Sequence, residues 1–263
     1  HPHKAASPDF SDPATGVDLT LYWGSVDGGT DPTEWEHTVS LGNYYGEVKE
    51  NGFWGTGYHQ NPNNNYFNNI ETIQALTPRS PPIVVLGEPN NPAANGFYFD
   101  TDNDFKNVGI GISRNDQYMD LWLADFNVAE TGNYRFRMDQ KDDYVTIWID
   151  LDQNGVFETT GANGNERLGG NGNFNSAYIP LVAGQSHKIA LAHGEGGGGS
   201  KFRAWVETPS LSDRVIKPLE AAQNGLFTIT KLSNGKLASE QIKIESALTG
   251  LIPGSTYYYR LHG

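Results

Sequence analysis

Cysteine is absent from the 263 residues of this chain. This absence excludes disulfides, thiolate metal sites and thiol catalysis, and it leaves the cellular compartment open. Basic residues are scarce as well: 18 Lys and Arg stand against 31 Asp and Glu, which gives a formal net charge of -13. Nucleic acid attracts basic surfaces, so we expect no nucleic-acid partner. An acidic surface suits hard divalent cations, although acidity also serves solubility alone.

Long apolar runs are also missing, because no segment approaches the roughly 20 apolar residues that a membrane-spanning helix needs. We therefore expect no membrane insertion. No stretch has the pattern of a signal peptide, which favours a cytosolic chain or a mature or excerpted form. The sequence has no HExxH zinc motif, no phosphate-binding loop and no Gly-x-Ser-x-Gly elbow. Nothing marks a carboxylate pair for glycoside hydrolysis, and we expect a protein that is not an enzyme.

The residues that are abundant are typical of extracellular β-proteins rich in turns: 31 Gly, 14 Pro and 12% aromatic residues. Many short segments alternate apolar and polar residues with the period of two that a half-buried strand needs. Residues 119–128 are apolar on both faces, which predicts a strand buried on both sides. One helix is expected at 69–76 with Asn69 as its cap, after an asparagine-rich loop at 61–69. The pattern predicts an all-β fold of antiparallel β-sandwiches.

The stretch Tyr134–Glu158 (YRFRMDQKDDYVTIWIDLDQNGVFE) holds two alternating segments joined by the acid pair Asp142-Asp143. We predict a hairpin whose tight connection carries this pair. The same reasoning predicts a second hairpin within residues 178–192. It also predicts paired strands on the two sides of the glycine-rich loop 193–200.

A second group of oxygen-bearing side chains follows the second of these segments, in Asp150-Leu-Asp152-Gln-Asn154-Gly155. It matches the first half of an EF-hand-type calcium loop, with oxygens at positions one, three and five and glycine at position six. Position twelve is Gly161, so the bidentate Glu of an EF-hand is missing. We predict a metal site at Asp150, Asp152 and Asn154. The alternative is a plain turn, because Asn-Gly alone is a hairpin signal.

A third acidic run, Asp100-Thr-Asp102-Asn-Asp104, has the same alternation without the glycine. We predict metal ligands at Asp100, Asp102 and Asp104, with a solvated turn as the alternative.

Several segments of the chain occur in an order that is familiar as a set. They are Gly132-Asn-Tyr134-Arg-Phe136, Asp142-Asp143, Ile147-Trp-Ile149-Asp150, Ile179-Pro-Leu181-Val-Ala183-Gly184, and Phe202-Arg-Ala-Trp205 after the glycine loop. With them, the region from about Gly52 to Pro209 resembles the lectin-like β-sandwich domain first described in anthrax protective antigen. That domain is also found in yeast flocculins, other adhesins and some glycosidases. Tyr144 stands where the family often has glycine, so the pocket is expected to differ in shape.

The resemblance implies a chemistry for the acid pair. In the adhesins of this family, the pair is joined by a cis peptide bond and binds calcium, which then accepts two hydroxyls of a sugar. Carried over by position, Asp142 and Asp143 are the calcium ligands and the sugar-binding residues, with an acidic hairpin turn as the alternative. Further ligands are expected from loops 163–175 or 193–200. In the second loop, His193 and Glu195 are candidates for lining the sugar site, against a merely exposed loop.

The flanks of the chain resemble a different family. Thr20-Leu-Tyr22-Trp23-Gly24 resembles the first half of a fibronectin type III-like module, and Leu248-Thr-Gly250 with Tyr257-Tyr-Tyr259-Arg260 resembles its second half. We predict strands at 226–230, 241–248 and 256–261. The predicted organisation has the two halves of this partial module at 1–45 and 225–263, the lectin-like sandwich inserted at 52–209, and a connector at 210–224. This module looks incomplete, which has two explanations: the sequence is an excerpt of a longer one, or a neighbouring copy of the chain supplies the missing strand by strand exchange.

These observations combine into one functional prediction. The chain is expected to be a calcium-dependent, carbohydrate-binding adhesion module of a secreted or cell-surface protein, with calcium as its cofactor and a glycan or polysaccharide as its partner. The alternative is a structural repeat unit of an extracellular fibre or surface array, in which calcium only stabilises the fold.

Overall fold

The computed structural model describes residues 17–44, 47–87, 96–159, 166–170, 173–232, 251–252 and 255–262. The chain divides into two compact units: the smaller comprises His1–Lys49 and Thr230–Gly263, and the larger comprises Glu50–Ile229. Strands paired in antiparallel sheets dominate both, which confirms the predicted all-β class. The strand predicted at 241–248 lies outside the described residues.

The smaller unit contains a three-stranded antiparallel sheet of order β17-β1-β2. Its strands are β1 (Val17–Gly24), β2 (His37–Tyr44) and β17 (Tyr258–His262), with a short 3-10 helix η1 (Pro32–Glu34) before β2. Trp23 is buried in it and stacks on the ring of His37 at 4.1 Å between centroids. The assignment of this unit to the fibronectin type III-like family stays a prediction.

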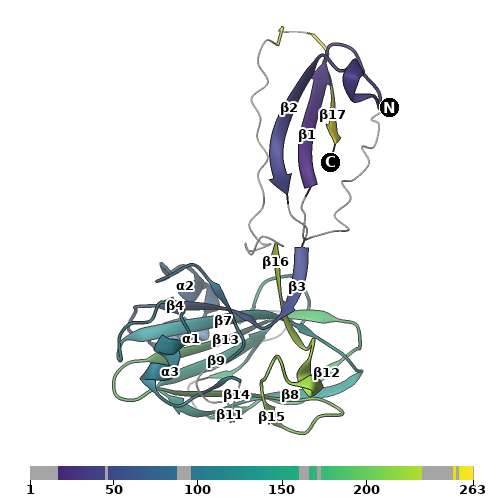
Figure 1. Cartoon of the computed structure of the whole chain (residues 1–263). Helices are drawn as coiled ribbons and strands as arrows, with labels where there is room; N and C mark the ends of the chain where they lie inside the picture. Colours follow the sequence, from purple (N-terminus) through teal and green to yellow (C-terminus); the bar gives the residue numbers. More distant parts are fainter. Residues whose placement is uncertain are drawn as a thin grey trace. The chain divides into compact units, whose positions relative to one another are not determined.

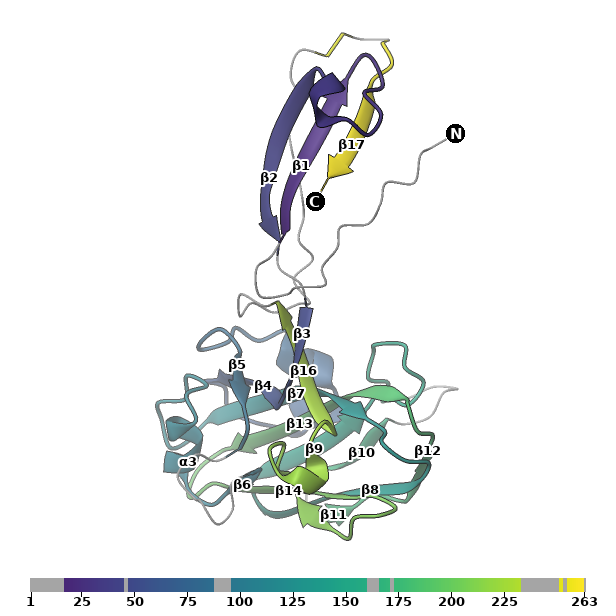
Figure 2. The same ribbon diagram turned by 45° about the vertical axis from the view of Figure 1, so that its right-hand side comes forward.

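The larger unit is built on two antiparallel sheets that form two layers (Figures 1 and 2). The eight-stranded sheet has the order β10-β9-β13-β7-β16-β3, and β4 pairs with both β7 and β5. Its strands are β3 (Glu47–Asn51), β4 (Phe53–Tyr58), β5 (Ile83–Val85), β7 (Tyr118–Asn127), β9 (Tyr144–Ile149), β10 (Arg167–Gly170), β13 (Ser186–Glu195) and β16 (Phe227–Leu232).

The six-stranded sheet has the order β11-β8-β14-β15, with β12 on β8 and β6 on β14. Its strands are β6 (Tyr98–Phe99), β8 (Gly132–Asp142), β11 (Phe174–Asn175), β12 (Ile179–Leu181), β14 (Lys201–Glu207) and β15 (Arg214–Val215). Residues 210–224, which we predicted as a connector, lie within the larger unit and contain β15 and the 3-10 helix η2 (Ala221–Gln223).

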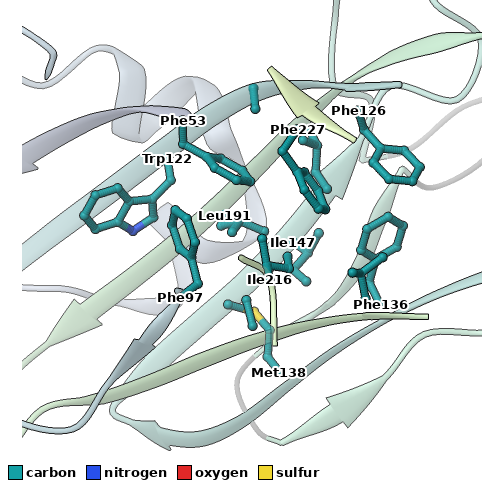
Figure 3. Packing of buried hydrophobic residues seen from close by; sticks show 14 of the residues in the cluster. Phe53, Phe97, Trp122, Phe126, Phe136, Met138, Ile147, Leu191, Ile216 and Phe227 are labelled. Atoms are coloured by element: carbon teal, nitrogen blue, oxygen red, sulfur yellow. The ribbon is translucent and has the colours of Figure 1, made fainter. Parts of the chain in front are cut away.

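The main core lies between the two sheets and is rich in aromatic rings (Figure 3). Phe136 and Met138 of β8 face Ile147 of β9 and Leu191 of β13 across this space. The ring of Phe126 meets the ring of Phe136 edge to face at 5.2 Å between centroids. Each such fully buried side chain contributes about 1.5–3 kcal/mol relative to exposure, so this interior dominates the stability of the sandwich.

The outer face of the eight-stranded sheet is covered as well. α1 (Asn64–Asn68) and α2 (Ile70–Gln74) place Phe67, Ile70 and Ile73 against Met119 and Leu121 of β7. This cover explains why β7 is apolar on both faces, as predicted. The expected helix at 69–76 is confirmed as α2, capped by the side chain of Asn69, but α1 forms where we predicted loop. Among the helices of the described residues, none combines the length and apolar character of a membrane span.

The predicted hairpins are wrong. β8 pairs with β11, β12 and β14, whereas β9 pairs with β10 and β13, so the chain changes sheets at Asp142-Asp143. The physical reason is that the apolar residues of both strands face one core from opposite sides, and the period of two is the same for this arrangement as for a hairpin. β12 and β13 also lie in different sheets, as do the strands β13 and β14 on the two sides of the glycine loop.

Removing core volume should therefore weaken the larger unit. We expect Leu191→Ala to lower its free energy of unfolding by about 2–5 kcal/mol, because the cavity lies in the fully buried interior between the sheets. Urea denaturation followed by tryptophan fluorescence measures this change. The control is Leu219→Ala, whose side chain is 65% exposed and should cost less than about 0.5 kcal/mol. Equal losses in the two variants would contradict the two-layer core.

Candidate functional site

Two connections between the sheets meet at one corner of the sandwich. β8 ends at Asp142, opposite Lys201 at the start of β14. β9 begins with Tyr144, opposite Gly194 in β13. β8 and β14 are neighbours in one sheet, and β9 and β13 are neighbours in the other. The β8–β9 connection and the β13–β14 glycine loop both pass between these two strand pairs, so the two connections lie next to each other.

The acid pair Asp142-Asp143 forms the first connection, and its peptide bond is cis, as the family resemblance implies. The N–H of Asp143 donates to the carbonyl oxygen of Gly194 at 3.1 Å. The N–H of Gly196 donates to Oδ2 of Asp143 at 2.8 Å. A Cβ at Gly196 would lie 2.9 Å from that same carboxylate oxygen, so a larger residue there would displace the Asp143 carboxylate from its present position.

Glu195, the last residue of β13, brings a third carboxylate to this corner. One oxygen each of Asp142, Asp143 and Glu195 lie within 4.8 Å of one another. Glu195 is 0% exposed, whereas the two aspartates are half-buried. Its Oε1 has no hydrogen-bond partner among the described residues, and its Oε2 accepts a long bond of 3.4 Å from the hydroxyl of Ser200. A buried carboxylate with so few donors is costly unless it is protonated or binds a cation.

The protonation of the cluster follows from this crowding. Burial, and then the charge of Asp143, raises the pKa of Glu195 to about 7. Burial and the neighbouring Asp143 also raise the pKa of Asp142 above its usual range. Without a metal, the three carboxyl groups therefore retain a proton near neutral pH. A bound cation would displace that proton, because metal ligation requires the deprotonated form.

A buried histidine lies beneath the acid pair. His193 and Asp120 are both 0% exposed, and Nδ1 of His193 is 2.9 Å from Oδ2 of Asp120. Nε2 of His193 is 2.9 Å from the carbonyl oxygen of Asp142. Since both partners are acceptors, both ring nitrogens carry a proton when both bonds form. Burial opposes the positive charge, but the charge and hydrogen bond of Asp120, the Asp142 carbonyl and the charge of Glu195 together outweigh it and raise the pKa of His193.

His193 therefore supports the acid pair from below, and its burial keeps its ring from the surface. The ring also stacks on Phe105 at 4.3 Å between centroids, and Asp120 accepts a hydrogen bond of 2.5 Å from the indole N–H of Trp122. We predicted His193 as a residue that contacts the sugar. The structure instead makes it a support of the Asp142 main chain.

The acidic run at 100–104 has a different role from the one we predicted. α3 (Asp102–Asn107) begins there, and Asp104 accepts the main-chain N–H of its N-cap residue Thr101 at 2.9 Å in a capping box. Asp100 forms an ion pair with Arg203 at 2.7 Å, and Asp102 accepts the hydroxyl of Ser200 at 2.5 Å. The structure does not bring the three carboxylates together, and they are not among the acidic clusters of the described residues. Helix capping explains their alternation.

A second acidic cluster lies at the other end of β9, where one oxygen each of Asp150, Asp152 and Glu166 lie within 4.8 Å of one another. Asp150 is buried and Asp152 is exposed. The N–H of Asn154 donates to Oδ1 of both aspartates at 3.1 Å. The N–H of Gly155 donates to Oδ2 of Asp150 at 2.8 Å, with Gly155 at φ 86°, where glycine is favoured. The loop thus holds the shape that the EF-hand pattern predicts for its first half.

Glu166 completes this second cluster, and we did not predict it. It is 0% exposed and accepts hydrogen bonds from the main-chain N–H groups of Leu151, Asp152 and Glu158, the last at 3.0 Å. Burial raises the pKa of its carboxyl group. Glu166 supplies in space the carboxylate that position twelve of the sequence pattern lacks, so the set again offers the hard oxygens that calcium prefers.

Asp120 and Glu166 are the site residues that the sequence interpretation missed. Asp120 had a signal, because it lies with Asp125 in a strand whose other residues are mostly apolar on both faces, and a buried acid there needs a partner. Glu166 follows the glycine- and asparagine-rich sequence Gly161-Ala-Asn-Gly-Asn165, and nothing in this sequence neighbourhood indicates that Glu166 lies beside Asp150.

Comparisons with known proteins give structural neighbours only. Neither the family models nor the curated proteins contain a match. The adhesin Epa9A domain of Candida glabrata, solved with Galb1-3GlcNAc, aligns over 64% of this chain and 85% of its own at 14% identity and a TM-score of 0.44. The PA14 domain of the MpAFP antifreeze protein aligns over 65% and 89% at 16% identity and a TM-score of 0.42.

An anti-sigma factor domain-containing protein from Clostridium clariflavum aligns over 63% of this chain at 14% identity and a TM-score of 0.41. The alignment spans only 45% of that protein's chain. The structural neighbours thus include lectin-like adhesin domains, and the roles of individual residues here rest on this chain's own geometry.

The buried carboxyl of Glu195 should make the metal-free protein less stable at higher pH. A carboxyl whose pKa rises on folding, here from 4.5 to about 7, contributes stability below pH 4.5 and loses it as the pH rises through about 7. We expect the free energy of unfolding in EDTA to fall over this window, by at most about 1.4 kcal/mol per pH unit for one proton. Urea titrations from pH 4.5 to pH 8 measure this. In Glu195→Gln the fall should be smaller, and an unchanged slope would contradict the assignment.

The buried pair Asp120–His193 should be strongly coupled. Either His193→Leu or Asp120→Asn alone should cost up to about 3–5 kcal/mol, because each disrupts a fully buried ion pair. The double variant should lose at least about 1 kcal/mol less than the sum of the single losses, as a double-mutant cycle in urea would measure. The control cycle uses Lys188 and Asp125, a pair whose lysine side chain is 56% exposed and whose coupling should stay below about 1 kcal/mol. Additive losses at Asp120 and His193 would contradict the paired state.

Proposed function

We propose that the larger unit is a calcium-dependent, carbohydrate-binding adhesion module of a secreted or cell-surface protein. The observation that carries this proposal is the convergence of the Asp142, Asp143 and Glu195 carboxylates at the corner where the glycine loop crosses between the sheets. Calcium prefers six to eight oxygen ligands, many of them carboxylates. Asp142 and Asp143 would hold the ion. The module binds and does not catalyse.

The surroundings of the cluster suit an ion that links the protein to a sugar in solvent. The aspartates are half-buried, so an ion between them would keep part of its coordination sphere toward solvent. Gly197 and Gly199 in the adjoining loop are exposed, and a Cβ added at either would meet no atom within 4 Å. The packing of the described residues thus leaves room above the loop for a sugar, two of whose hydroxyls would replace waters on the ion. Glycan or polysaccharide is the partner that this chemistry fits.

A second calcium ion is proposed at Asp150, Asp152 and Glu166. Asp150 and Glu166 are buried and already hydrogen-bonded to the main chain of their loop, which suits an ion that stabilises the loop rather than one that binds a ligand. This cluster favours the alternative function: a structural unit of an extracellular fibre or surface array in which calcium only stabilises the fold. Completion of the smaller unit by strand exchange between copies stays a prediction.

Substitutions at the two clusters separate the two functions. Asp142→Asn and Asp143→Asn should abolish binding on a glycan array, and EDTA should do the same for the unaltered protein, because the ion forms the bridge. Asp152→Asn is the matched control. It should reduce the rise in melting temperature on adding calcium, which follows from the preferential binding of calcium to the folded state, and it should leave glycan binding intact.

The opposite pattern would reject the adhesion module. If the protein binds no glycan at millimolar concentration while EDTA lowers its melting temperature, calcium is a stabiliser only and the structural unit is the better description. If EDTA changes neither glycan binding nor melting, calcium has no role in either function.

A further inference from the structure

Glu195 differs from the two aspartates beside it in its surroundings. The aspartates are half-buried, whereas Glu195 is 0% exposed and cannot reach a ligand in solvent directly. We predicted it as a residue that contacts the sugar, and its burial opposes that role. What it does reach is the space between the Asp142 and Asp143 carboxylates, since one oxygen of each group lies within 4.8 Å of the others.

The hydrogen bonds of Glu195 leave this carboxylate incompletely satisfied. Its Oε1 has no partner in the part of the chain that the structure describes, and its Oε2 accepts only the 3.4 Å bond from Ser200 that is noted above. The hydroxyl of Ser200 lies closer to Asp102 and to the hydroxyl of Tyr118, both at 2.5 Å, so it donates preferentially elsewhere. A fully buried carboxylate with one unpartnered oxygen, and with one oxygen within 4.8 Å of two other carboxylates, has the arrangement of a cation ligand.

We propose that Glu195 is a third carboxylate ligand of the ion at Asp142 and Asp143, and that the resulting net negative charge makes the site select neutral sugars over anionic ones. This inference rests on the proposed function. Three negative charges against the two of Ca²⁺ leave one negative charge at the site, whereas a two-carboxylate site would be neutral. A sugar carboxylate or sulfate held beside the ion would meet that charge.

The other charged groups around the corner do not cancel this excess. His193 and Asp120 form a buried pair of opposite charges beneath the cluster. Lys201 is exposed, so water and salt screen its charge. Asp116, which accepts the N–H of Gly198 at 3.1 Å, is exposed as well, so its charge is screened in the same way. The half-buried Asp102, which accepts the hydroxyl of Ser200, adds negative charge. The corner therefore remains acidic after an ion has bound.

The role of Glu195 in binding the ion is tested first, by isothermal titration with CaCl₂ at pH 7.5. Glu195→Gln should weaken calcium binding by about 10–100-fold, because affinity follows the number of charged ligands. Its melting temperature in EDTA should equal or exceed that of the unaltered protein, since glutamine removes a buried charge, and this separates lost ligation from misfolding. The control is Glu34→Gln, an exposed position in the smaller unit. Calcium affinity within twofold of the unaltered protein would overturn the assignment.

The sugar preference is tested next, with pairs of probes that differ only at C6: methyl glucoside, galactoside and mannoside, each against its methyl uronide. At 10 mM CaCl₂ and low ionic strength, the neutral member of the bound pair should bind about three- to tenfold more tightly, as expected for one unit charge near the ion. The ratio should shrink in Glu195→Gln at saturating calcium and in high salt. A uronide that binds as tightly as its neutral partner would overturn the preference.

Failure of the proposed function gives a different result from failure of this inference. If Asp142→Asn and Asp143→Asn leave calcium affinity unchanged, no ion is bound at the pair, and both the proposed function and the role of Glu195 fail. If these variants weaken calcium binding but the calcium-loaded protein binds no member of any pair, only the proposed function fails. The calcium titrations of Glu195→Gln then decide the role of Glu195 on their own: a weakened affinity supports it as a ligand, and an unchanged affinity rejects it.

Discussion

The two sheets of the larger unit share one apolar interior, and the candidate site depends on how the chain crosses between them. A strand with one apolar face on this interior can continue either into a neighbour of its own sheet or into the opposite layer, and both β8 and β13 pass to the opposite layer. Because β8 leads to β9 and β13 leads to β14, and these strands pair crosswise, the two crossings occur at one corner. The acids of both crossings are brought together by the core, although they are far apart in the sequence.

Burial at this corner has a cost that the neighbouring residues partly offset. Asp120 lies within β7, and the neutralising partner that it finds is His193 on the adjacent strand, in the register that sets His193 opposite Asp120. The same histidine then reaches the main chain of Asp142. β13 therefore has two opposite effects on the charge of this region. Its His193 neutralises the buried Asp120, and two residues later its Glu195 adds another buried acid. Among the described residues, no cation lies at salt-bridge distance from Glu195.

The all-β class, the doubly buried strand β7 and helix α2 follow from periodicity and capping, which are local properties of the sequence. The sheet partners do not, because a period of two says which face of a strand is apolar and not which strand lies beside it. The acid pair at 142–143 and the EF-hand-like loop at 150–155 were visible for the same reason: their residues are neighbours in sequence. Glu195 as a neighbour of Asp143, and Glu166 as a neighbour of Asp150, depend on long-range pairing and became visible only in the fold.

The two acidic clusters differ in what an ion would connect, and this difference separates a ligand site from a stabilising one. At the first, the carboxylates come from two connections that cross between the sheets, beside an exposed loop with room above it. At the second, Asp150 and Glu166 are buried and already accept hydrogen bonds from main-chain amides of residues 151–158. An ion there would have few coordination positions open to a molecule in solvent, and its main effect would be to stabilise the loop. An ion at the first cluster has its protein ligands on one side, which is the geometry that leaves coordination positions for hydroxyl groups on the other.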